Sequence, residues 1–323
     1  MYLTTNLINE IFEKPYVERL SRKLNILTGY ASSSFLHHIL ERYPEIEINL
    51  IIGMAKKDGI NLWDHQEYQI LTKERENVNV FYYNAYPSIH SKVYHWLSED
   101  SLFNEGSDTF VGSANFSWNG FRDQIELLVP AHYDSIIDVF KIDHLLKCTD
   151  SLVESEIKLH SIFLPNRDHL SQNEFVKESV IVGKDFIDLP LFIEKEKKIH
   201  QKSGLNWGQR TGREPNQAYI PVPTSFNKRH PRFFPPLKEE FTMLTDDRQS
   251  FICVMAQENR KAIESSRNNS LIGKYFRERL GLYLGAKVEL GDLEKYGRKY
   301  VRVHKLDNET FYMDFSKKMP SYS

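Results

Sequence analysis

Long hydrophobic runs are absent from this 323-residue sequence, which contains no apolar stretch of about eighteen residues and so predicts no transmembrane helix. The opening residues, from Met1 to Asn6, lack the basic and apolar segments of a signal peptide, and we expect a cytoplasmic protein without a membrane partner. Cysteine is also scarce. Cys148 and Cys253 lie far apart without metal-ligand spacing, so the sequence predicts two core cysteines rather than a disulfide framework or a zinc site.

A strong excess of one charge is missing as well, because the formal net charge is only -2 at pH 7. Nucleic-acid binding would therefore depend on a local surface. Between Lys202 and Lys238 the sequence holds seven basic residues and one acidic residue, Glu214, and this stretch is a candidate phosphate-binding surface. A hydrophobic content of 41% is enough for packed cores, and the length predicts about two domains.

The first half of the chain alternates strand and helix signals. Strands are predicted at 24–30, 46–54 and 77–84, and helices at 33–43 and 63–76. This alternation indicates an α/β sheet with helices on both faces. A further helix is expected at about 135–152, followed by a connector at 159–167, and we place the first domain at residues 1–165.

The second domain, at 166–323, is predicted to be rich in β-strands. Strand signals occur at 250–255, 299–304 and 310–315. Asn269 and Ser270 are expected to begin a helix whose apolar face, which includes Ile272, belongs to the core.

A possible catalytic motif begins with a strand predicted at 88–94. Alternation of side chains places His90 and Lys92 on one face of this strand and His95 on the other. A histidine alone in a strand is more often structural, but an imidazole two residues from an ammonium is suited to attack and bind a phosphate.

Two further predicted strands add polar groups to this motif. In the strand at 109–115, Gly112 is expected to let a phosphate approach the backbone, while Ser113 and Asn115 alternate onto one side. The strand at 124–129 contributes the carboxylate of Glu126. The alternative interpretation is that Glu126 faces solvent in an edge strand and has no catalytic role. We predict that His90, Lys92, Ser113, Asn115 and Glu126 are catalytic.

His-x-Lys followed by Gly-Ser-x-Asn and an acidic residue resembles the phospholipase D superfamily, which implies its α/β fold and phosphohistidine chemistry. The sequence departs from that pattern at Leu97, where an aspartate is common, and in a longer spacer, which we interpret as a hairpin loop at 99–108. Members of the superfamily need two such motifs per active site. The other His-x-Lys, from His200 to Lys202, has no Gly-Ser-x-Asn behind it and is interpreted as a charged turn.

Two polar clusters in the second half contain side chains that read base edges in DNA, at 205–221 and 257–269. The alternative is that loops are simply polar. Besides base-reading side chains, the prediction includes two candidate phosphate contacts, Lys228 and Arg232. The residues predicted to bind DNA are Arg210, Thr211, Arg213, Asn216, Gln217, Tyr219, Lys228, Arg232, Gln257, Asn259, Lys261, Asn268 and Asn269.

With a single motif and these polar stretches, nearly the whole chain resembles the metal-independent restriction endonucleases of the BfiI and NgoFVII type. The resemblance implies a C-terminal DNA-recognition domain with a B3-like pseudobarrel fold that grips the major groove with two arms. Because one chain supplies one motif, two chains must share an active site, as a homodimer formed through the N-terminal domain. The roles that follow are His90 as nucleophile and leaving-group acid, Lys92 and Asn115 as phosphate ligands, Ser113 as an auxiliary donor, and Glu126 as acceptor from the far ring nitrogen of His90.

This interpretation predicts cleavage of specific double-stranded DNA without a metal or other cofactor, so that activity persists in EDTA. A cognate DNA methyltransferase is the expected partner in a restriction-modification system. Two other classes of function stay open. A lipid phosphodiesterase would share the motif but is expected to carry two copies and a membrane-facing element, and a DNA-binding regulator would have lost catalysis.

Overall fold

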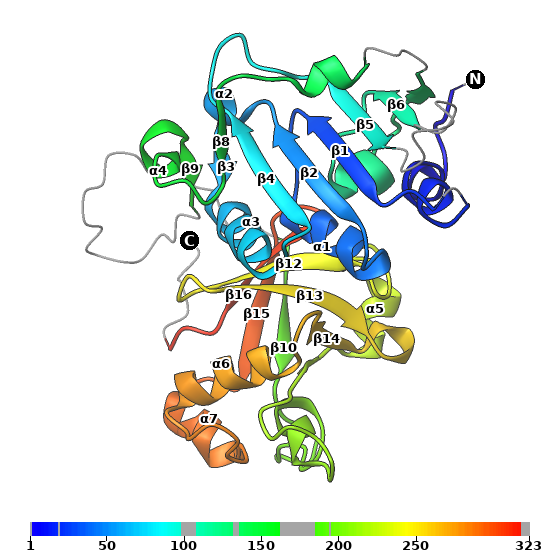
Figure 1. Cartoon of the computed structure of the whole chain (residues 1–323). Helices are drawn as coiled ribbons and strands as arrows, with labels where there is room; N and C mark the ends of the chain where they lie inside the picture. The colour runs from blue at the N-terminus through cyan, green and yellow to red at the C-terminus, as the bar shows by residue number, and fades with distance from the viewer. Residues whose placement is uncertain are drawn as a thin grey trace. The chain divides into compact units, whose positions relative to one another are not determined.

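The computed structural model describes residues 2–18, 20–97, 108–131, 136–161, 185–193 and 195–317. The chain divides into two units, one containing the described residues up to 161 and the other those from 185 onward (Figure 1). The predicted domain boundary at 165 falls between these two ranges, outside the described residues. Within the described ranges, none of the helices has the length and apolarity needed to cross a lipid bilayer.

Seven described strands of the first unit form one mixed sheet in the order β7-β6-β5-β1-β2-β4-β8. The parallel centre, β1, β2 and β4, confirms the predicted strand and helix alternation, and β5 joins β1 antiparallel. A small pair, β3 and β9, is separate. The strands are β1 (Lys23–Thr28), β2 (Glu47–Ile52), β3 (Ile60–Asn61), β4 (Val78–Tyr83), β5 (Lys92–Leu97), β6 (Thr109–Gly112), β7 (Leu128–Pro130), β8 (Leu145–Lys147) and β9 (Leu159–His160).

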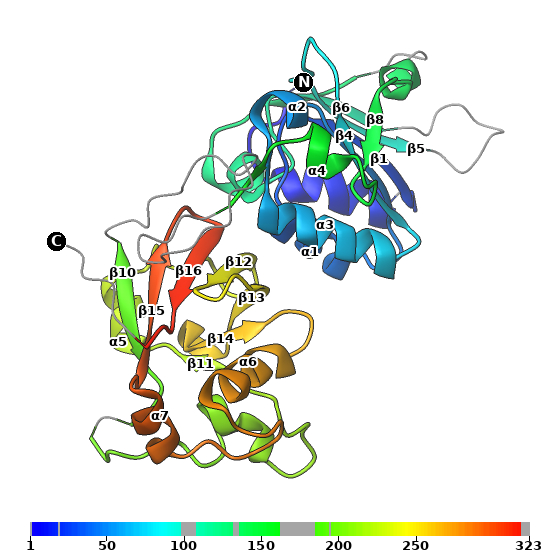
Figure 2. The ribbon, with the colours of Figure 1, turned by 90° about the vertical axis from the view of Figure 1, so that its left-hand side faces the viewer.

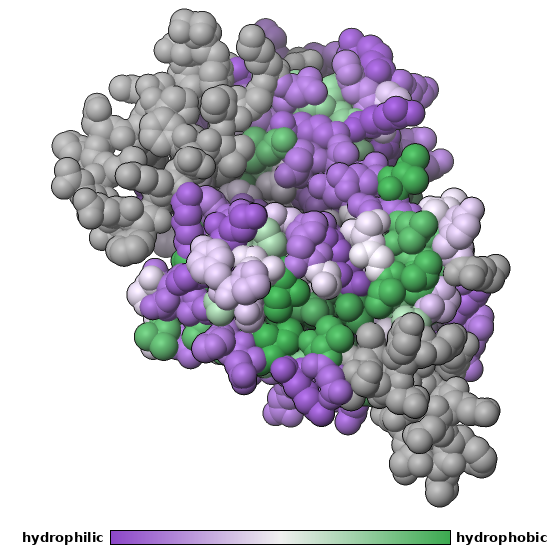
Figure 3. All heavy atoms as spheres, turned by 90° about the horizontal axis from the view of Figure 1, so that it is seen from above, coloured by the Kyte–Doolittle hydropathy of each residue, from purple (hydrophilic) through white to green (hydrophobic). Residues whose placement is uncertain are grey.

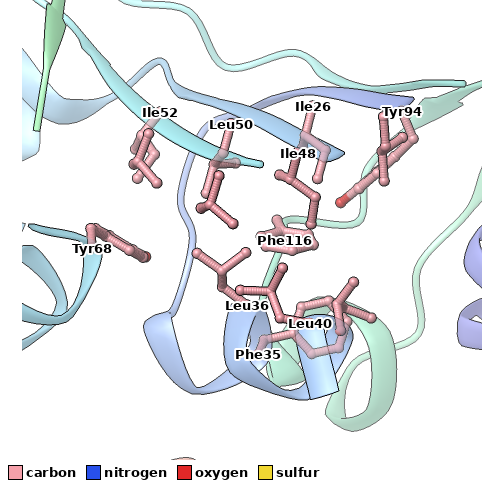
Figure 4. Packing of buried hydrophobic residues seen from close by; sticks show 14 of the residues in the cluster. Ile26, Phe35, Leu36, Leu40, Ile48, Leu50, Ile52, Tyr68, Tyr94 and Phe116 are labelled. Atoms are coloured by element: carbon pink, nitrogen blue, oxygen red, sulfur yellow. The ribbon is translucent and has the colours of Figure 1, made fainter. Parts of the chain in front are cut away.

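The helices α1 and α3 lie together on one face of this sheet (Figure 2). From the strands β1 and β2, the side chains of Ile26, Ile48 and Leu50 point toward Phe35 and Leu36 of α1 (Figure 4). All five side chains are fully buried, so their removal from water stabilises this layer. The described helical segments of the unit are η1 (Asn9–Glu18), α1 (Ser33–Arg42), α2 (Ala55–Asp58), α3 (Leu62–Glu74), η2 (Asn119–Asp123), η3 (Ile136–Phe140) and α4 (Val153–Glu156).

The opposite face of the sheet carries a smaller apolar cluster. Leu27, Ile51 and Val93 are neighbours across three strands and are buried, with Phe140 packed over them. Figure 3, which looks down from above the view of Figure 1, shows hydrophobic residues gathered in the middle of this side among polar ones. His95 also faces this side, where its ring stacks on Phe140, so its prediction as a residue facing away from Lys92 is confirmed.

The prediction of a helix at 135–152 is wrong. The described residues of this segment form η3, then the edge strand β8, which pairs antiparallel with β4. His144 has a positive φ of 60°, which ends any helix before β8, and the amide of Cys148 donates to the Val80 carbonyl. The closely spaced apolar residues suit both a helix and a strand, and the unpaired edge of β4 selects the strand.

In the second unit, seven described strands form a nearly closed, barrel-like sheet in the order β10-β15-β16-β12-β13-β14-β11, whose end strands β10 and β11 approach each other. Neighbours are antiparallel except β12 and β16, which are parallel. The predicted strands at 250–255, 299–304 and 310–315 are confirmed. The strands are β10 (Phe186–Pro190), β11 (Ile220–Pro221), β12 (Glu240–Thr245), β13 (Ser250–Ala256), β14 (Ala262–Ser265), β15 (Tyr300–Lys305) and β16 (Thr310–Asp314).

The predicted helix after Asn269 is also confirmed as α6 (Ser270–Leu280), with Ile272, Tyr275 and Phe276 in the core. The other described helical segments of the unit are η4 (Gly204–Gln209), α5 (Thr224–Arg229), η5 (Glu258–Arg260) and α7 (Leu290–Tyr296). Both predicted core cysteines, Cys148 and Cys253, are buried.

A buried carboxylate connects α6 to the barrel. Asp246, which follows β12, accepts two hydrogen bonds from the guanidinium of Arg279, at 2.6 Å and 3.1 Å. It also accepts from the Tyr275 hydroxyl and from the amide of Phe315, each at 3.1 Å. These bonds compensate the cost of burying the charge and fix α6 against both β12 and the end of β16.

Candidate active site and DNA-binding loops

Three strand ends meet at one edge of the first sheet. Because β5 is antiparallel to both β1 and β6, the end of β1, the start of β5 and the end of β6 lie at the same edge. In this register Lys92, the first residue of β5, is opposite Gly112, the last residue of β6. The two halves of the predicted motif are thereby brought together, and residues 28–30 join them from β1.

His90 lies in an extended segment before β5 and not in the strand, so the prediction that one strand carries both His90 and Lys92 is wrong. The segment is bound to the end of β2, where the amide of Ile89 donates to the Gly53 carbonyl at 3.1 Å. A Cβ at Gly53 would lie 2.2 Å from the Ile89 carbonyl oxygen, so only glycine admits this approach. This hydrogen bond between Ile89 and Gly53 holds the segment before β5, where the sequence pattern predicts the start of the strand.

Lys92 is buried and lies on the same face of β5 as Tyr94. Its Nζ lies 3.0 Å from Nδ1 and 3.1 Å from Nε2 of His90, and donates to the His90 carbonyl at 2.7 Å. Burial lowers the pKa of the Lys92 ammonium, and the negative charge of Glu126 opposes that shift. The ammonium and the imidazole are in contact, as binding and attack at one phosphate require.

Asn115 belongs to the turn after β6, because the strand ends at Gly112 and not at 115 as predicted. Its Oδ1 accepts from the amide of Tyr30 at 3.1 Å, which leaves the amide nitrogen Nδ2 as the donor for a ligand. The predicted reason for Gly112 is also corrected. A Cβ there would lie 1.9 Å from the carbonyl oxygen of Leu127, so the close approach at Gly112 is made by the neighbouring backbone.

Ser113 and Glu126 form a separate pair at this edge. The Ser113 hydroxyl donates to a carboxylate oxygen of Glu126 and accepts from the amide of Leu127 at 3.0 Å. Glu126 precedes β7, which begins at Leu128, so the strand predicted at 124–129 is shorter than expected. Within the described part of this chain, the Glu126 carboxylate is hydrogen-bonded to Ser113. The predicted contact between Glu126 and His90 is not formed there.

Gly29 forms the floor between two of these groups. A Cβ at this position would lie 2.9 Å from Cδ2 of His90 and 3.3 Å from Oδ1 of Asn115. We predict that Gly29→Ala lowers the rate of the phosphodiester cleavage expected from the sequence by about 10- to 100-fold, because the added Cβ pushes the His90 ring away and a misplacement of up to about 1 Å in a reacting group can cost that much. Gly291→Ala is the matched control, since a Cβ there meets nothing within 4 Å.

The measurement is single-turnover cleavage of DNA by each variant, with thermal unfolding recorded in parallel. A Gly29→Ala protein that cleaves as fast as the Gly291→Ala protein would show that His90 and Asn115 need not hold these positions.

In the second unit, three predicted DNA-binding residues gather around Trp207. The guanidinium carbon of Arg213 lies 3.8 Å above the centroid of the indole, and its Nη1 donates to Oε1 of Gln217 at 2.8 Å. Tyr219 meets the same indole edge to face at 5.5 Å. We call these four residues the Trp207 cluster. Stacking and the hydrogen bond restrict the Arg213 side chain, while its exposed position leaves donor groups available to a ligand.

Around this cluster, Arg210 and Thr211 are exposed, and Nε of Arg210 donates to the Lys202 carbonyl at 2.7 Å. Asn216 is different. It is buried, its Nδ2 donates to Glu214 at 2.8 Å, and its Oδ1 accepts from the amide of Gly285 at 2.6 Å. This side chain holds the loop together, and its placement does not support the predicted base contact.

The second polar cluster, predicted as one arm, is divided by β14. Before the strand, Asn259 and Lys261 are exposed beside α5, where Asn227 donates to the Asn259 carbonyl at 3.1 Å. After the strand, the Asn269 carbonyl accepts from the amide of Ala218 at 3.0 Å, so this end packs on the 205–221 loop.

The remaining predicted residues are distributed over these two ends. Gln257 donates to Glu264 at 3.0 Å, and Oδ1 of Asn268 accepts from the amide of Ser270 at 2.9 Å. The side-chain oxygen of Asn269 is buried at the start of α6. Lys228 and Arg232 are exposed on α5 and just beyond it.

Two family models match the sequence. One, described as the NgoFVII restriction endonuclease N-terminal PLD domain, matches residues 5–155, and the other, described as the NgoFVII C-terminal B3-like DNA-binding domain, matches residues 182–307. Together they account for most of the chain. The protein belongs to the NgoFVII family of restriction endonucleases. No curated protein matches the chain.

Solved structures similar to this NgoFVII-family chain are distant. Polyphosphate kinase from Porphyromonas gingivalis is 16% identical over 45% of this chain, with a TM-score of 0.32, and the chain spans only 23% of that protein's length. A hypothetical protein from Arabidopsis thaliana is 16% identical over 43% of this chain and 97% of its own length, with a TM-score of 0.22.

The two matched ranges of the NgoFVII family separate the predicted residues cleanly. The first contains every predicted catalytic residue, and the second contains every predicted DNA-binding residue. Sequence reasoning did not identify Gly29 and Tyr30 as part of the site. The available signal was a glycine near the end of the strand predicted at 24–30, since the carboxyl ends of parallel strands are where α/β sheets place their sites.

Proposed function

We propose that this restriction endonuclease cleaves specific double-stranded DNA without a metal ion, through a phosphohistidine intermediate in a site shared by two copies of the chain. The observation that carries the proposal is the contact between the His90 imidazole and the Lys92 ammonium at the sheet edge where Asn115 presents an amide donor. A nucleophile, a cation and a neutral donor are the groups that phosphoryl transfer needs.

Stoichiometry supports the homodimer. Among the described residues, this edge has one imidazole in contact with Lys92, whereas the reaction needs a nucleophile and an acid. The other His-x-Lys, at His200 and Lys202, is exposed in the second unit before η4. We therefore expect the first units of two chains, proposed to comprise residues 1–165, to pair around a two-fold axis that brings both His90 side chains to one phosphorus.

In this site a nitrogen of one His90 attacks the phosphorus and forms the N–P bond, while the P–O bond to the leaving oxygen breaks. His90 of the second copy gives its proton to that oxygen. Water then attacks the phosphorus, the N–P bond breaks, and the second His90 takes the proton from the water. Lys92 and Asn115 bind the nonbridging oxygens, and Ser113 acts as an auxiliary donor once its hydroxyl has turned from Glu126 to the phosphate.

Glu126 has its described contact with Ser113, so fixing the tautomer of His90, as the sequence predicts, requires the carboxylate to leave Ser113 or to reach the imidazole of the other copy. In its described position the negative charge of Glu126 opposes the lowering of the Lys92 pKa by burial.

The test is incubation of plasmid DNA with the protein in excess EDTA. We expect discrete fragments at the rate seen with added Mg²⁺, because Lys92 and His90 supply the charge and the nucleophile that a metal supplies elsewhere. Loss of cutting in EDTA that Mg²⁺ restores would contradict metal independence. Retention of DNA without cutting under all conditions would instead indicate a regulator.

The second unit, proposed to comprise residues 166–323, is expected to read the DNA sequence through the Trp207 cluster and the loops at both ends of β14. Arg213 is the best placed of these side chains, because it is exposed and restrained by Trp207 and Gln217. A methyltransferase that modifies the same DNA sequence is the expected partner in the cell.

We predict that Arg213→Ala or Gln217→Ala lowers specific affinity by about 1–3 kcal/mol where the side chain contacts a base. Lys228→Ala and Arg232→Ala should weaken binding to all sequences and flatten its salt dependence, because they remove phosphate contacts. Binding to specific and random duplexes across a salt series distinguishes the two groups. Equal losses on both duplexes for Arg213→Ala would remove this residue from base reading.

A further inference from the structure

The imidazole of His90 has few partners that determine its orientation. Its described contacts are the Nζ of Lys92 and the ring of Tyr30, whereas the carboxylate of Glu126 is bound to Ser113. The Nζ of Lys92 is nearly equally distant from the two ring nitrogens, and it must move toward the phosphate when a substrate binds. Another group is therefore needed to hold the ring while Lys92 binds the substrate.

Tyr30 lies directly against this ring. The two ring centroids are 5.9 Å apart and the planes cross at 76°, an edge-to-face arrangement that aromatic rings prefer. In the sequence Tyr30 comes directly after Gly29, whose missing Cβ leaves room for the His90 ring. Tyr30 also contacts Asn115, but through its backbone amide, which donates to Oδ1 of Asn115. A change of the Tyr30 side chain therefore affects the imidazole and leaves the hydrogen bond to Asn115 in place.

The far end of the Tyr30 side chain is anchored. Its hydroxyl donates to a carboxylate oxygen of Asp58 at 2.5 Å, and this bond raises the pKa of the phenol to about 12. Asp58 is itself held at the end of α2, where its amide donates to the Met54 carbonyl and its carbonyl accepts from Nε2 of His160 at 2.7 Å. Although 41% of Tyr30 is exposed, its ring is fixed at both ends.

We propose that Tyr30 is a positioning residue for the nucleophile: its ring holds the imidazole of His90 in line for attack, and Asp58 holds the Tyr30 ring. The inference rests on the proposed function, since it assigns the orientation of His90 to a residue of the same site. Near-attack alignment contributes strongly to the rate of a displacement, while substrate binding depends on other side chains. The effect should therefore fall on the chemical step.

The test compares Tyr30→Ala and Tyr30→Phe with the unchanged protein in single-turnover cleavage of DNA bound in advance. We expect Tyr30→Ala to cleave about 10- to 100-fold more slowly with unchanged DNA affinity. Tyr30→Phe keeps the ring and should recover most of the rate, and Asp58→Asn should have an effect of similar size to Tyr30→Phe. Tyr2→Ala, which removes an exposed tyrosine from the same unit, is the matched control.

A spectroscopic measurement keeps the proposal testable if Tyr30→Ala folds poorly. In the unchanged protein, the His90 ring protons should show a ring-current shift, identified by the loss of these signals in His90→Ala. Tyr30→Leu should abolish the shift and Tyr30→Phe should preserve it. Wild-type cleavage by Tyr30→Ala, or His90 signals that do not change in Tyr30→Leu, would overturn the inference.

These outcomes are separate from a failure of the proposed function. An active His90→Ala protein would refute the phosphohistidine mechanism. An inactive His90→Ala protein together with a fully active Tyr30→Ala protein would refute only the role of Tyr30.

Discussion

His90→Ala is expected to lower DNA cleavage by about four to six orders of magnitude, the loss typical of removing a covalent nucleophile from a catalytic unit. The substitution is unusually severe in a two-fold symmetric site, because it removes both the attacking nitrogen and the acid for the leaving oxygen. Specific DNA binding should remain, since the Trp207 cluster lies in the other unit.

The measurement is cleavage at saturating protein, with binding of the same duplex followed in parallel. Mixing His90→Ala chains with wild-type chains sharpens the result. Heterodimers should be inactive, so excess mutant should suppress the activity of a fixed amount of wild-type protein once chains have exchanged. Undiminished activity per wild-type chain would mean that one motif suffices and that the shared site is wrong.

Asp246→Ala is expected to destabilise the second unit by about 3 kcal/mol, the lower end of the cost of breaking a buried ion pair, because of its described carboxylate partners the guanidinium of Arg279 keeps only the partly exposed Asp247, at a longer distance of 3.3 Å. The loss also includes the hydrogen bonds from Tyr275 and from the Phe315 amide. A change of this size is a large fraction of the stability of a domain of this length. The unit that carries the DNA-binding loops should therefore unfold at a lower temperature, and specific DNA retention should be lost with it.

Calorimetry of the full chain provides the measurement, together with Asp188→Ala as a matched control. Asp188 also makes a two-bond contact with an arginine, Arg302, at 2.8 Å for each bond, but 40% of its side chain is exposed. Arg302 is 11% exposed, but the exposed Asp188 carboxylate is partly screened by water, so this variant should lose less than Asp246→Ala, about 1 kcal/mol. Equal destabilisation by the two variants would show that burial of the Asp246 contact is not what determines its strength.

The sequence predicts the central strands and helices of the first unit well, because the strands are short runs rich in apolar residues and α1 carries one apolar face. It fails at 135–152, where apolar residues suit both states and the outcome depends on the free edge of β4. That edge is a tertiary feature without a local signal. The hairpin loop predicted at 99–108 lies mostly outside the described residues, although its flanking strands β5 and β6 do pair antiparallel.

The candidate site is predictable in its residue types but not in its contacts. His90, Lys92 and Asn115 come together because three strand ends meet, which the motif spacing already suggests. The contact of Ser113 with Glu126 and the contact of Tyr30 with His90 depend on side-chain directions at turns, which periodicity does not determine. The burial of Asn216 was missed for a related reason, since a polar loop that folds on itself has the same composition as one that faces a ligand.

The short strand β14 separates two groups of polar residues that the sequence presents as one. Residues 257–261 lie before it and residues 266–269 after it. A strand of four residues extends over about 13 Å. The major groove of B-form DNA is about 12 Å wide. The two polar groups are therefore separated along β14 by a length comparable to the width of the groove, and on the proposed function they would contact DNA as two distinct loops and not as one arm.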